Sequence, residues 1–348
     1  MALIASSTLS PLNVTLQQPV NGSTNASQVW SPLGPLSELI TWCGMYALVA
    51  IITAIGNGLT LAVFYMQRDK PGIRKCHNNK FLCSLAVADL FVGALCVPMY
   101  VTQLISSWGP GHLETSVLSN QIFLTMDVFC GMASVFTLCV IALDRFFSVY
   151  APHAHRMASA TVYLTALCSP WLLSSFLALF FFLSLLGYLP FKYVYNAVSL
   201  SLFTALCVMS AAYAGTGTSL RRSAAKAGRQ SARSAANRRK QVKFTKLTLI
   251  VTLTFLVSWC PFQILNIVFY VCTIRGMFCT PVISASAVQS VKLLQYASSM
   301  ANPAIYSFKI PEFRGVIKEK TSLLRARGST RALKMNQRRD GIELTVES

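Results

Sequence analysis

The sequence predicts an all-α membrane protein, a bundle of seven transmembrane helices followed by a short amphipathic juxtamembrane helix. Its composition is the first indication, because 54% of the 348 residues are hydrophobic and only 12% are charged. Soluble domains carry about 25% charged residues. The second indication is a series of long apolar runs, and the third is that the basic residues gather in a few of the segments between these runs.

Seven apolar runs follow one another along the chain. They cover residues 39–66, 80–105, 117–150, 158–189, 193–219, 247–272 and 282–308. Each exceeds the roughly 20 residues that a helix needs to cross a bilayer core. The spans are expected to be helices, since a membrane barrel would show short segments of alternating hydrophobicity instead.

The lysines and arginines predict the orientation in the membrane. Of the 30 lysines and arginines, 27 fall in the segments 68–80, 145–156, 221–246 and 309–339, and residues 1–38 contain none. Because basic residues favour the cytoplasmic side, the N-terminus is expected outside and the C-terminus inside. Three acceptor motifs for N-glycosylation begin at Asn13, Asn21 and Asn25. They agree with an extracellular N-terminal tail.

These observations predict a multi-pass protein of the plasma membrane whose chain has three parts. They are an extracellular glycosylated tail over 1–38, a seven-transmembrane domain over 39–308, and a cytoplasmic tail over 309–348 that begins with the amphipathic helix. The net charge of +19 does not predict nucleic-acid binding, because it lies on one side of the bilayer.

Other classes of protein find less support in the sequence. There is no nucleophile with a partner base and no metal-ligand spacing, so no enzyme is expected. A transporter or channel is the remote alternative, but no internal repeat is evident. Cys272 and Cys279 flank an outer loop, where a disulfide and two free thiols both remain open.

The third run carries charges at both ends. Asp127 and Arg145 are 18 residues apart, which is five helical turns or about 27 Å on one face. Asp127 then lies in the outer half of the membrane and Arg145 at the cytoplasmic end. Ser134 lies on nearly the same stripe as Asp127. Polar groups in spans usually face the bundle interior, so this helix presents an anion to an outer cavity.

Two further stripes lie in the sixth and seventh runs. One face of the sixth carries Phe255, Trp259, Phe262 and Asn266, and one face of the seventh carries Lys292, Tyr296, Ser299, Asn302 and Tyr306. Pro261 and Pro303 interrupt the backbone ladder of these helices. Aromatic stripes also arise from simple packing, so the stripes alone do not define a ligand site.

Several short motifs occur in order along the spans. They are Gly56-Asn57, Leu85-Ala86-Val87-Ala88-Asp89-Leu90, Asp144-Arg145-Phe146, Trp171, Ser258-Trp259-Cys260-Pro261 and Asn302-Pro303-Ala304-Ile305-Tyr306. Over roughly 39–320 the chain therefore resembles rhodopsin-like (class A) G-protein-coupled receptors.

The resemblance implies roles for individual residues. Asp89, Ser134 and Asn302 would line a pocket for an allosteric sodium ion, and no other cofactor is expected. The activation switch would comprise Asp144, Arg145, Tyr213, Phe255, Trp259, Pro261, Pro303 and Tyr306. The implied partners are an extracellular small-molecule ligand, a heterotrimeric G protein, arrestin, receptor kinases and the lipid bilayer.

Within this family the third run most resembles receptors for biogenic amines. Asp127 stands where those receptors pair with the ligand ammonium, and Tyr296 stands where a tyrosine supports that aspartate. Phe262 and Asn266 would line the site, and Ser201 would offer a hydroxyl. A carboxylate surrounded by aromatic rings suits an ammonium group.

Other features depart from the amine pattern. Both cysteines of the family's usual disulfide are missing, since Asn120 replaces one and residues 185–194 contain no cysteine. This pattern resembles the melanocortin, lysophospholipid and cannabinoid receptors, so a lipid or peptide ligand remains an alternative. Lys292 lies one turn above Tyr296, where it could pair with Asp127, accept a zwitterion, or extend to the outer surface. It lies one turn too high for the lysine of an opsin. Gln241 replaces a glutamate that restrains the arginine, which predicts raised basal signalling.

Overall fold

A computed structural model describes residues 35–66, 77–107, 117–225, 232–275 and 284–309. The chain divides into two compact units, Met1–Pro303 and Ala304–Ser348. The described part of the second unit is residues 304–309, the last turns of a helix. The predicted juxtamembrane helix and the glycosylation sites lie outside the described residues, so these remain predictions.

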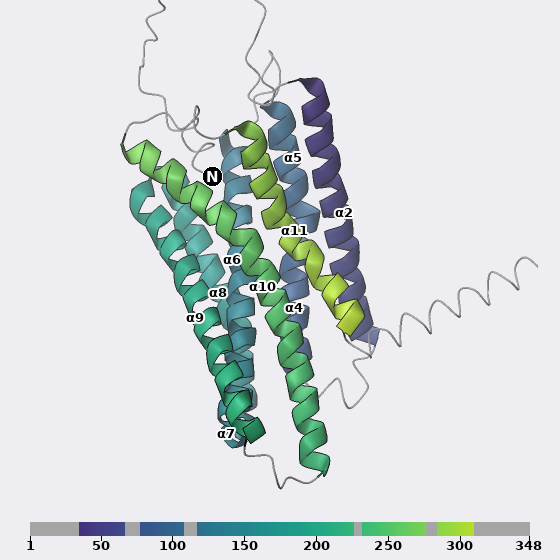
Figure 1. Ribbon diagram of the computed structural model, residues 1–348. Coiled ribbons are helices and arrows are strands. Elements are labelled where there is room, and N and C mark those ends of the chain that lie inside the picture. Colours follow the sequence, from purple (N-terminus) through teal and green to yellow (C-terminus); the bar gives the residue numbers. More distant parts are fainter. Residues whose placement is uncertain (1–34, 67–76, 108–116, 226–231, 276–283, 310–348) are drawn as a thin grey trace, which may run out of the picture. The chain divides into compact units, whose positions relative to one another are not determined.

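The regular elements of the described residues are all helical (Figure 1). They are α2 (Leu36–Met66), α4 (His77–Phe91), the π-helical turn η1 (Val92–Cys96), α5 (Val97–Ser106), α6 (Val117–Tyr150), α7 (Pro152–Met157), α8 (Ala160–Leu185), α9 (Phe191–Ala225), α10 (Ala232–Ile274) and α11 (Ala285–Lys309).

Six of the predicted spans are long and apolar enough to cross a membrane. These are α2, the continuous stretch α4–η1–α5, α6, α8, α9 and the apolar part of α10. The seventh predicted span corresponds to α11, which is 25 residues long. It is not among the six, because glutamines, serines, Asn302 and Lys292 lower its hydropathy.

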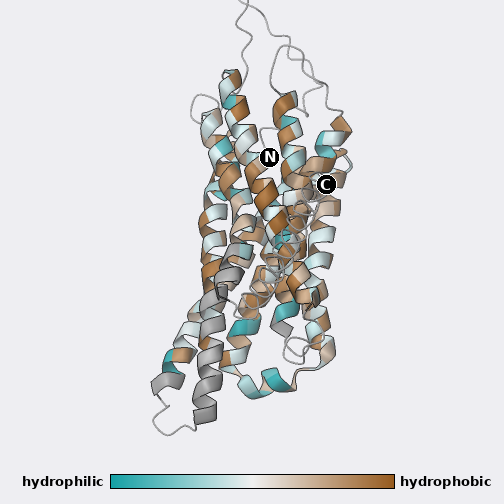
Figure 2. Ribbon diagram, turned by 90° about the vertical axis from the view of Figure 1, so that its right-hand side faces the viewer, coloured by the Kyte–Doolittle hydropathy of each residue, from teal (hydrophilic) through white to brown (hydrophobic). Residues whose placement is uncertain are grey.

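Large apolar side chains are exposed along the helices, and Figure 2 shows that hydrophobic residues occur along most of the helical ribbon. Leu172 of α8 is 69% exposed and Val257 of α10 is 68% exposed. In a water-soluble protein, most such large apolar residues would be buried in the interior. Exposed apolar bands of this extent mark contact with a membrane. The outer surfaces of these helices therefore suit lipid, whereas Asp89, Asp127 and Lys292 are buried inside the bundle.

The second predicted span is not a uniform α-helix. Between α4 and α5 the backbone forms η1, and the amide of Val97 donates to the carbonyl of Val92, five residues earlier. Pro98, which lacks an amide proton, follows directly and weakens the regular four-residue ladder. The sequence analysis did not anticipate this turn, which brings Val92 to the wall of a cavity.

The fourth span ends four residues earlier than predicted, at Leu185. Gly187 has a φ of 86°, a left-handed conformation that glycine adopts without steric cost. The amides of Gly187 and Tyr188 donate to the carbonyls of Ser184 and Leu183, at 3.2 and 3.0 Å. This arrangement caps the open carbonyls of the last turn and ends the helix.

The fifth and sixth helices extend beyond the predicted spans. The runs were predicted to end at residue 219 and to begin at residue 247, but α9 continues to Ala225 and α10 begins at Ala232. The short helix α7 between the third and fourth spans was also not predicted. Its six residues are too few to produce a recognisable apolar period.

Helix α6 is the most buried of the six spans. It packs against α4, α8, α9 and α10. Two motif residues connect other helices by hydrogen bonds: Trp171 of α8 donates to Oγ of Ser84 at 2.8 Å, and Asn57 of α2 donates to the carbonyl of Ser299 at 3.2 Å. These bonds satisfy polar groups that could find no water in the bilayer.

Candidate ligand cavity and cytoplasmic switch

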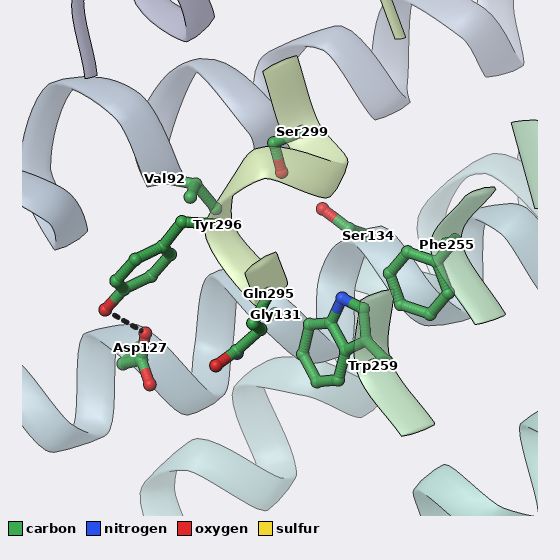
Figure 3. A pocket seen from close by; sticks show the side chains of 9 residues that line it. All are labelled: Val92, Asp127, Gly131, Ser134, Phe255, Trp259, Gln295, Tyr296 and Ser299. Atoms are coloured by element: carbon green, nitrogen blue, oxygen red, sulfur yellow. Dashed lines mark hydrogen bonds between the residues drawn. The ribbon is translucent and has the colours of Figure 1, made fainter. Parts of the chain in front are cut away.

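Asp127 is a buried carboxylate in the N-terminal half of α6, 5% exposed. The hydroxyl of Tyr296 donates to its Oδ1 at 2.9 Å, a bond drawn in Figure 3. The ammonium of Lys292 donates to its Oδ2 at 2.7 Å. Of the three placements that the sequence left open for Lys292, pairing with Asp127 is the one observed.

The Lys292 ammonium lies in a cage of polar and aromatic groups. Besides Asp127 it donates to Oε1 of Gln295 at 3.0 Å. Its nitrogen lies 4.6 Å from the ring centroid of Tyr296, 4.7 Å from that of Phe262 and 5.8 Å from that of Tyr100. Lys292 itself is 6% exposed, so it does not extend to the surface. These contacts are those expected at an ammonium-binding site.

A second layer of polar groups supports the cage. The hydroxyls of Tyr46 and Tyr100 both donate to Oε1 of Gln289, at 3.0 and 2.9 Å. The ring of Tyr296 packs edge-on against both tyrosine rings. Tyr46, Tyr100 and Gln289 were not predicted from the sequence. Gln289 lies three residues before Lys292 on the predicted inward stripe, so the helical period could have identified it.

Two cavities adjoin Asp127. The larger is partly open to solvent and lies among α6, α8, α9, α10 and α11. Its lining combines apolar groups with amides and hydroxyls: Asp127, Val128, Met132, Phe181, Tyr195, Val198, Ser199, Leu202, Trp259, Phe262, Gln263, Asn266 and Gln295. Phe262 and Asn266 therefore line this cavity, and their contact with a ligand stays a prediction.

Ser201 does not reach this cavity. Its hydroxyl donates to the carbonyl of Ala197 in its own helix at 2.7 Å. Ser199, two residues earlier, lines the cavity instead. The predicted ligand hydroxyl is thus assigned to the wrong position, because a helix turns through about 200° in two residues and presents a different face.

The smaller cavity lies below Asp127 and contacts the aromatic switch residues (Figure 3). The rings of Phe255 and Trp259 stack with centroids 4.9 Å apart, and the indole nitrogen of Trp259 donates to Ser298 at 3.3 Å. A Cβ at Gly131 would lie 2.8 Å from the Trp259 ring. Glycine at this position therefore lets the indole pack directly against α6.

The predicted sodium-pocket residues come together deeper in the bundle. Asp89 is 1% exposed, and its two oxygens accept from Ser134 at 3.2 Å and from Asn302 at 2.6 Å. Three helices, α4, α6 and α11, thus converge on one carboxylate. Neutral donors satisfy its hydrogen bonds, and carboxylate and hydroxyl oxygens are the donors that a hard cation prefers.

Near the C-terminal end of α6, Arg145 is 3% exposed and pairs with Asp144. Nε of Arg145 donates to Oδ2 of Asp144 at 3.1 Å. Nε2 of His155, on α7, lies 2.8 Å from the other oxygen of Asp144. The sequence analysis did not identify His155, because no local pattern connects it with Asp144, eleven residues away. Both carboxylate oxygens are engaged.

The remaining switch residues are partly described. The hydroxyls of Tyr213 on α9 and Thr252 on α10 are 3.1 Å apart. Pro261 and Pro303 lie inside α10 and α11. The side chains of Tyr306 and Gln241 are outside the described part. Cys272 is disulfide-bonded, and its predicted partner Cys279 lies outside the described residues, so that pairing remains a prediction.

This geometry, a central helix with a carboxylate in an outer cavity and an arginine at its inner end, agrees with a match to a protein family. The model for 7 transmembrane receptors of the rhodopsin family matches residues 56–306, which is most of the chain. The chain belongs to the rhodopsin family of seven-transmembrane receptors. Members of this family are non-enzymatic signalling receptors of the membrane, as the sequence predicted.

Individual rhodopsin-family receptors are also similar to this chain. An allatostatin-A receptor of Bombyx mori is 28% identical over 331 residues, covering 87% of this chain and 86% of that receptor. A D(5)-like dopamine receptor of Takifugu rubripes is 26% identical, with 83% and 69% covered. The muscarinic acetylcholine receptor M3 of Gallus gallus is 30% identical over 154 residues, 44% of this chain, and the match spans only 21% of that receptor.

Proposed function

We propose that this chain is a cell-surface G-protein-coupled receptor that binds a small extracellular ligand through a cationic group at Asp127. It crosses the plasma membrane seven times, with α11 as the seventh span, the N-terminus outside and the C-terminus inside. The family match and the one-sided distribution of basic residues support this topology.

The observation that carries the ligand proposal is the position of Asp127. It is a buried carboxylate on the wall of both cavities, with aromatic rings around it. An ionisable group inside a membrane bundle is costly and usually functional. Two of the similar receptors carry acetylcholine and dopamine in their names, which agrees with a cationic ligand, while the allatostatin-A receptor keeps a peptide ligand open.

Transmission would run along α6 and α10. Trp259 borders both cavities and stacks on Phe255, one turn deeper in α10. A ligand that binds better when this aromatic pair is displaced would shift the population of α10 positions. The movement would release Arg145 toward a heterotrimeric G protein, and arrestin and receptor kinases would act on the same cytoplasmic face.

A sodium ion would fit the Asp89 cluster. Asp89, Ser134 and Asn302 supply a buried carboxylate with hydroxyl and amide groups, and neutral donors alone contact this carboxylate among the described residues. A bound sodium ion would supply the compensating charge there. These residues would hold the ion and so link α4, α6 and α11 in one conformation.

The test is a ligand screen on cells that express the wild type or the Asp127→Asn variant. Amines, amino acids, short peptides and lipids would be applied, with second-messenger production as the readout. Removing one partner of a buried ion pair in a complex costs about 2–5 kcal/mol, so the potency of a cationic ligand should fall at least about 30-fold. Unchanged potency in Asp127→Asn, at equal surface expression, would refute the proposal.

A further inference from the structure

The ammonium site of this receptor is already filled by its own side chain. Lys292 reaches Asp127 from α11 and makes the contacts that a ligand ammonium would otherwise make, with a carboxylate, an amide oxygen and aromatic ring faces. Asp127 has one oxygen on Lys292 and the other on Tyr296. Any cationic ligand must therefore take the place of the lysine ammonium.

The charge balance limits which ligands can do this. Asp127 and Lys292 are 5% and 6% exposed, and together they are neutral. A simple amine that displaced Lys292 would leave a buried ammonium without a counter-charge. A simple carboxylate that paired with Lys292 would leave Asp127 unpaired. An uncompensated buried charge is strongly unfavourable, whereas an exchange of partners keeps every charge paired.

We propose that the site recognises a zwitterion, whose ammonium pairs with Asp127 while its carboxylate pairs with Lys292. This inference rests on the proposed function, since it uses the same cavity. Nζ of Lys292 and Oδ2 of Asp127 are only 2.7 Å apart. The two ligand charges must therefore be close together, as they are when an amine and a carboxylate share one carbon atom in a free α-amino acid.

The neighbouring cavity indicates the rest of the ligand. Val128, Met132, Phe181 and Leu202 give it an apolar wall that suits an apolar side chain. Its other polar members are neutral amides and hydroxyls, and Asp127 is its one charged lining residue. The cavity thus offers an apolar space beside the Asp127–Lys292 pair, whose two charges match the ammonium and the carboxylate of an amino acid such as phenylalanine, leucine or tryptophan.

The experiment compares three compounds that share one side chain and differ in charge. They are phenylalanine, phenethylamine and 3-phenylpropionate, with matching leucine and tryptophan sets. Each is tested for thermal stabilisation of the purified full-length receptor and for second-messenger output in cells. In the wild type the amino acids should be at least about 10-fold more potent than the amines or the acids, a difference of about 1.4 kcal/mol.

Two variants should change this ranking in opposite directions. In Lys292→Met the amines should become more potent than the amino acids, because the ligand carboxylate then has no cation. In Asp127→Asn the acids should become at least as potent as the amino acids. Ser210→Ala is the matched control, because this exposed serine bonds within α9 and should keep the wild-type order.

The outcomes separate this inference from the proposed function. If amines act best on the wild type and Asp127→Asn abolishes their effect, the zwitterion inference is wrong and the cationic ligand stands. If no amino acid in the panel stabilises or activates the wild type, the inference is also wrong. The double variant Asp127→Asn/Lys292→Met, which is neutral like the wild type, should fold and bind the three classes without preference.

Discussion

The ammonium of Lys292 lies 2.7 Å from a carboxylate oxygen of Asp127, and both side chains are buried inside the helix bundle. Asp127 belongs to the amine-receptor pattern and Lys292 departs from it. Their pairing joins α6 to α11 beside the ligand cavity. It therefore acts on stability and on ligand choice, and both effects can be measured.

The pair predicts a non-additive loss of stability. Lys292→Met or Asp127→Asn alone should lower the free energy of unfolding by up to about 3–5 kcal/mol, because each leaves one buried charge unpaired. The double variant should recover most of that loss. Thermal unfolding of the purified receptor measures all four proteins. Additive losses in the double variant would show that the two side chains are not coupled.

Sodium is expected to stabilise the receptor through Asp89. Its melting temperature should rise with sodium chloride and not with choline chloride at equal ionic strength, because the small cation neutralises a buried carboxylate. Asp89→Asn should abolish this difference, while Asp127→Asn should retain it, since Asp127 lies in the outer cavity. A sodium effect that persists in Asp89→Asn would place the ion elsewhere.

The contact between Gly131 and Trp259 predicts a position-specific effect of alanine. Gly131→Ala would put a Cβ 2.8 Å from the indole ring and force Trp259 to move, at a cost of about 1–3 kcal/mol. Gly58→Ala is the control, because nothing lies within 4 Å of its Cβ position. We expect altered basal signalling in the first variant and wild-type behaviour in the second. Equal effects of both substitutions would contradict the packing argument.

The bond between His155 and Asp144 should stabilise the cytoplasmic end of α6. His155→Ala removes a contact 2.8 Å long to a largely buried carboxylate, so the free energy of unfolding should fall by about 1 kcal/mol. His153→Ala, on the same short helix and exposed, should have no measurable effect. Hydrogen exchange of α7 should increase in the first variant alone. Identical exchange in both variants would argue against the bond.

Gln241 predicts raised basal signalling, because the glutamate expected at this position would restrain Arg145. Cells that express the receptor without ligand should show second-messenger levels above mock-transfected cells. Gln241→Glu should lower that level, whereas the neutral Gln241→Met should not, since it adds no charge for the arginine. Basal output equal to mock cells would show that the arginine is restrained by other means.

Much of this architecture is a local property of the sequence. Hydropathy over about 20 residues predicted six spans that the structure confirms, with α6 at the predicted bounds, Val117–Tyr150. The partners of Asp89 were predicted because family motifs carry Asp89 and Asn302 at recognisable positions. Helix ends were less accurate, since they depend on caps such as Gly187 and on helical continuation outside the membrane.

The sequence by itself determined the family and the residues available to an inner cavity, and it predicts a membrane orientation, because hydropathy, charge and helical period act over short stretches. Only the tertiary structure decided which of them meet. Lys292 and Asp127 are 165 residues apart, and their contact depends on the rotation and tilt of α6 and α11 together. The rotation of α9 directs Ser199 rather than Ser201 into the cavity, and α7 brings His155 to Asp144.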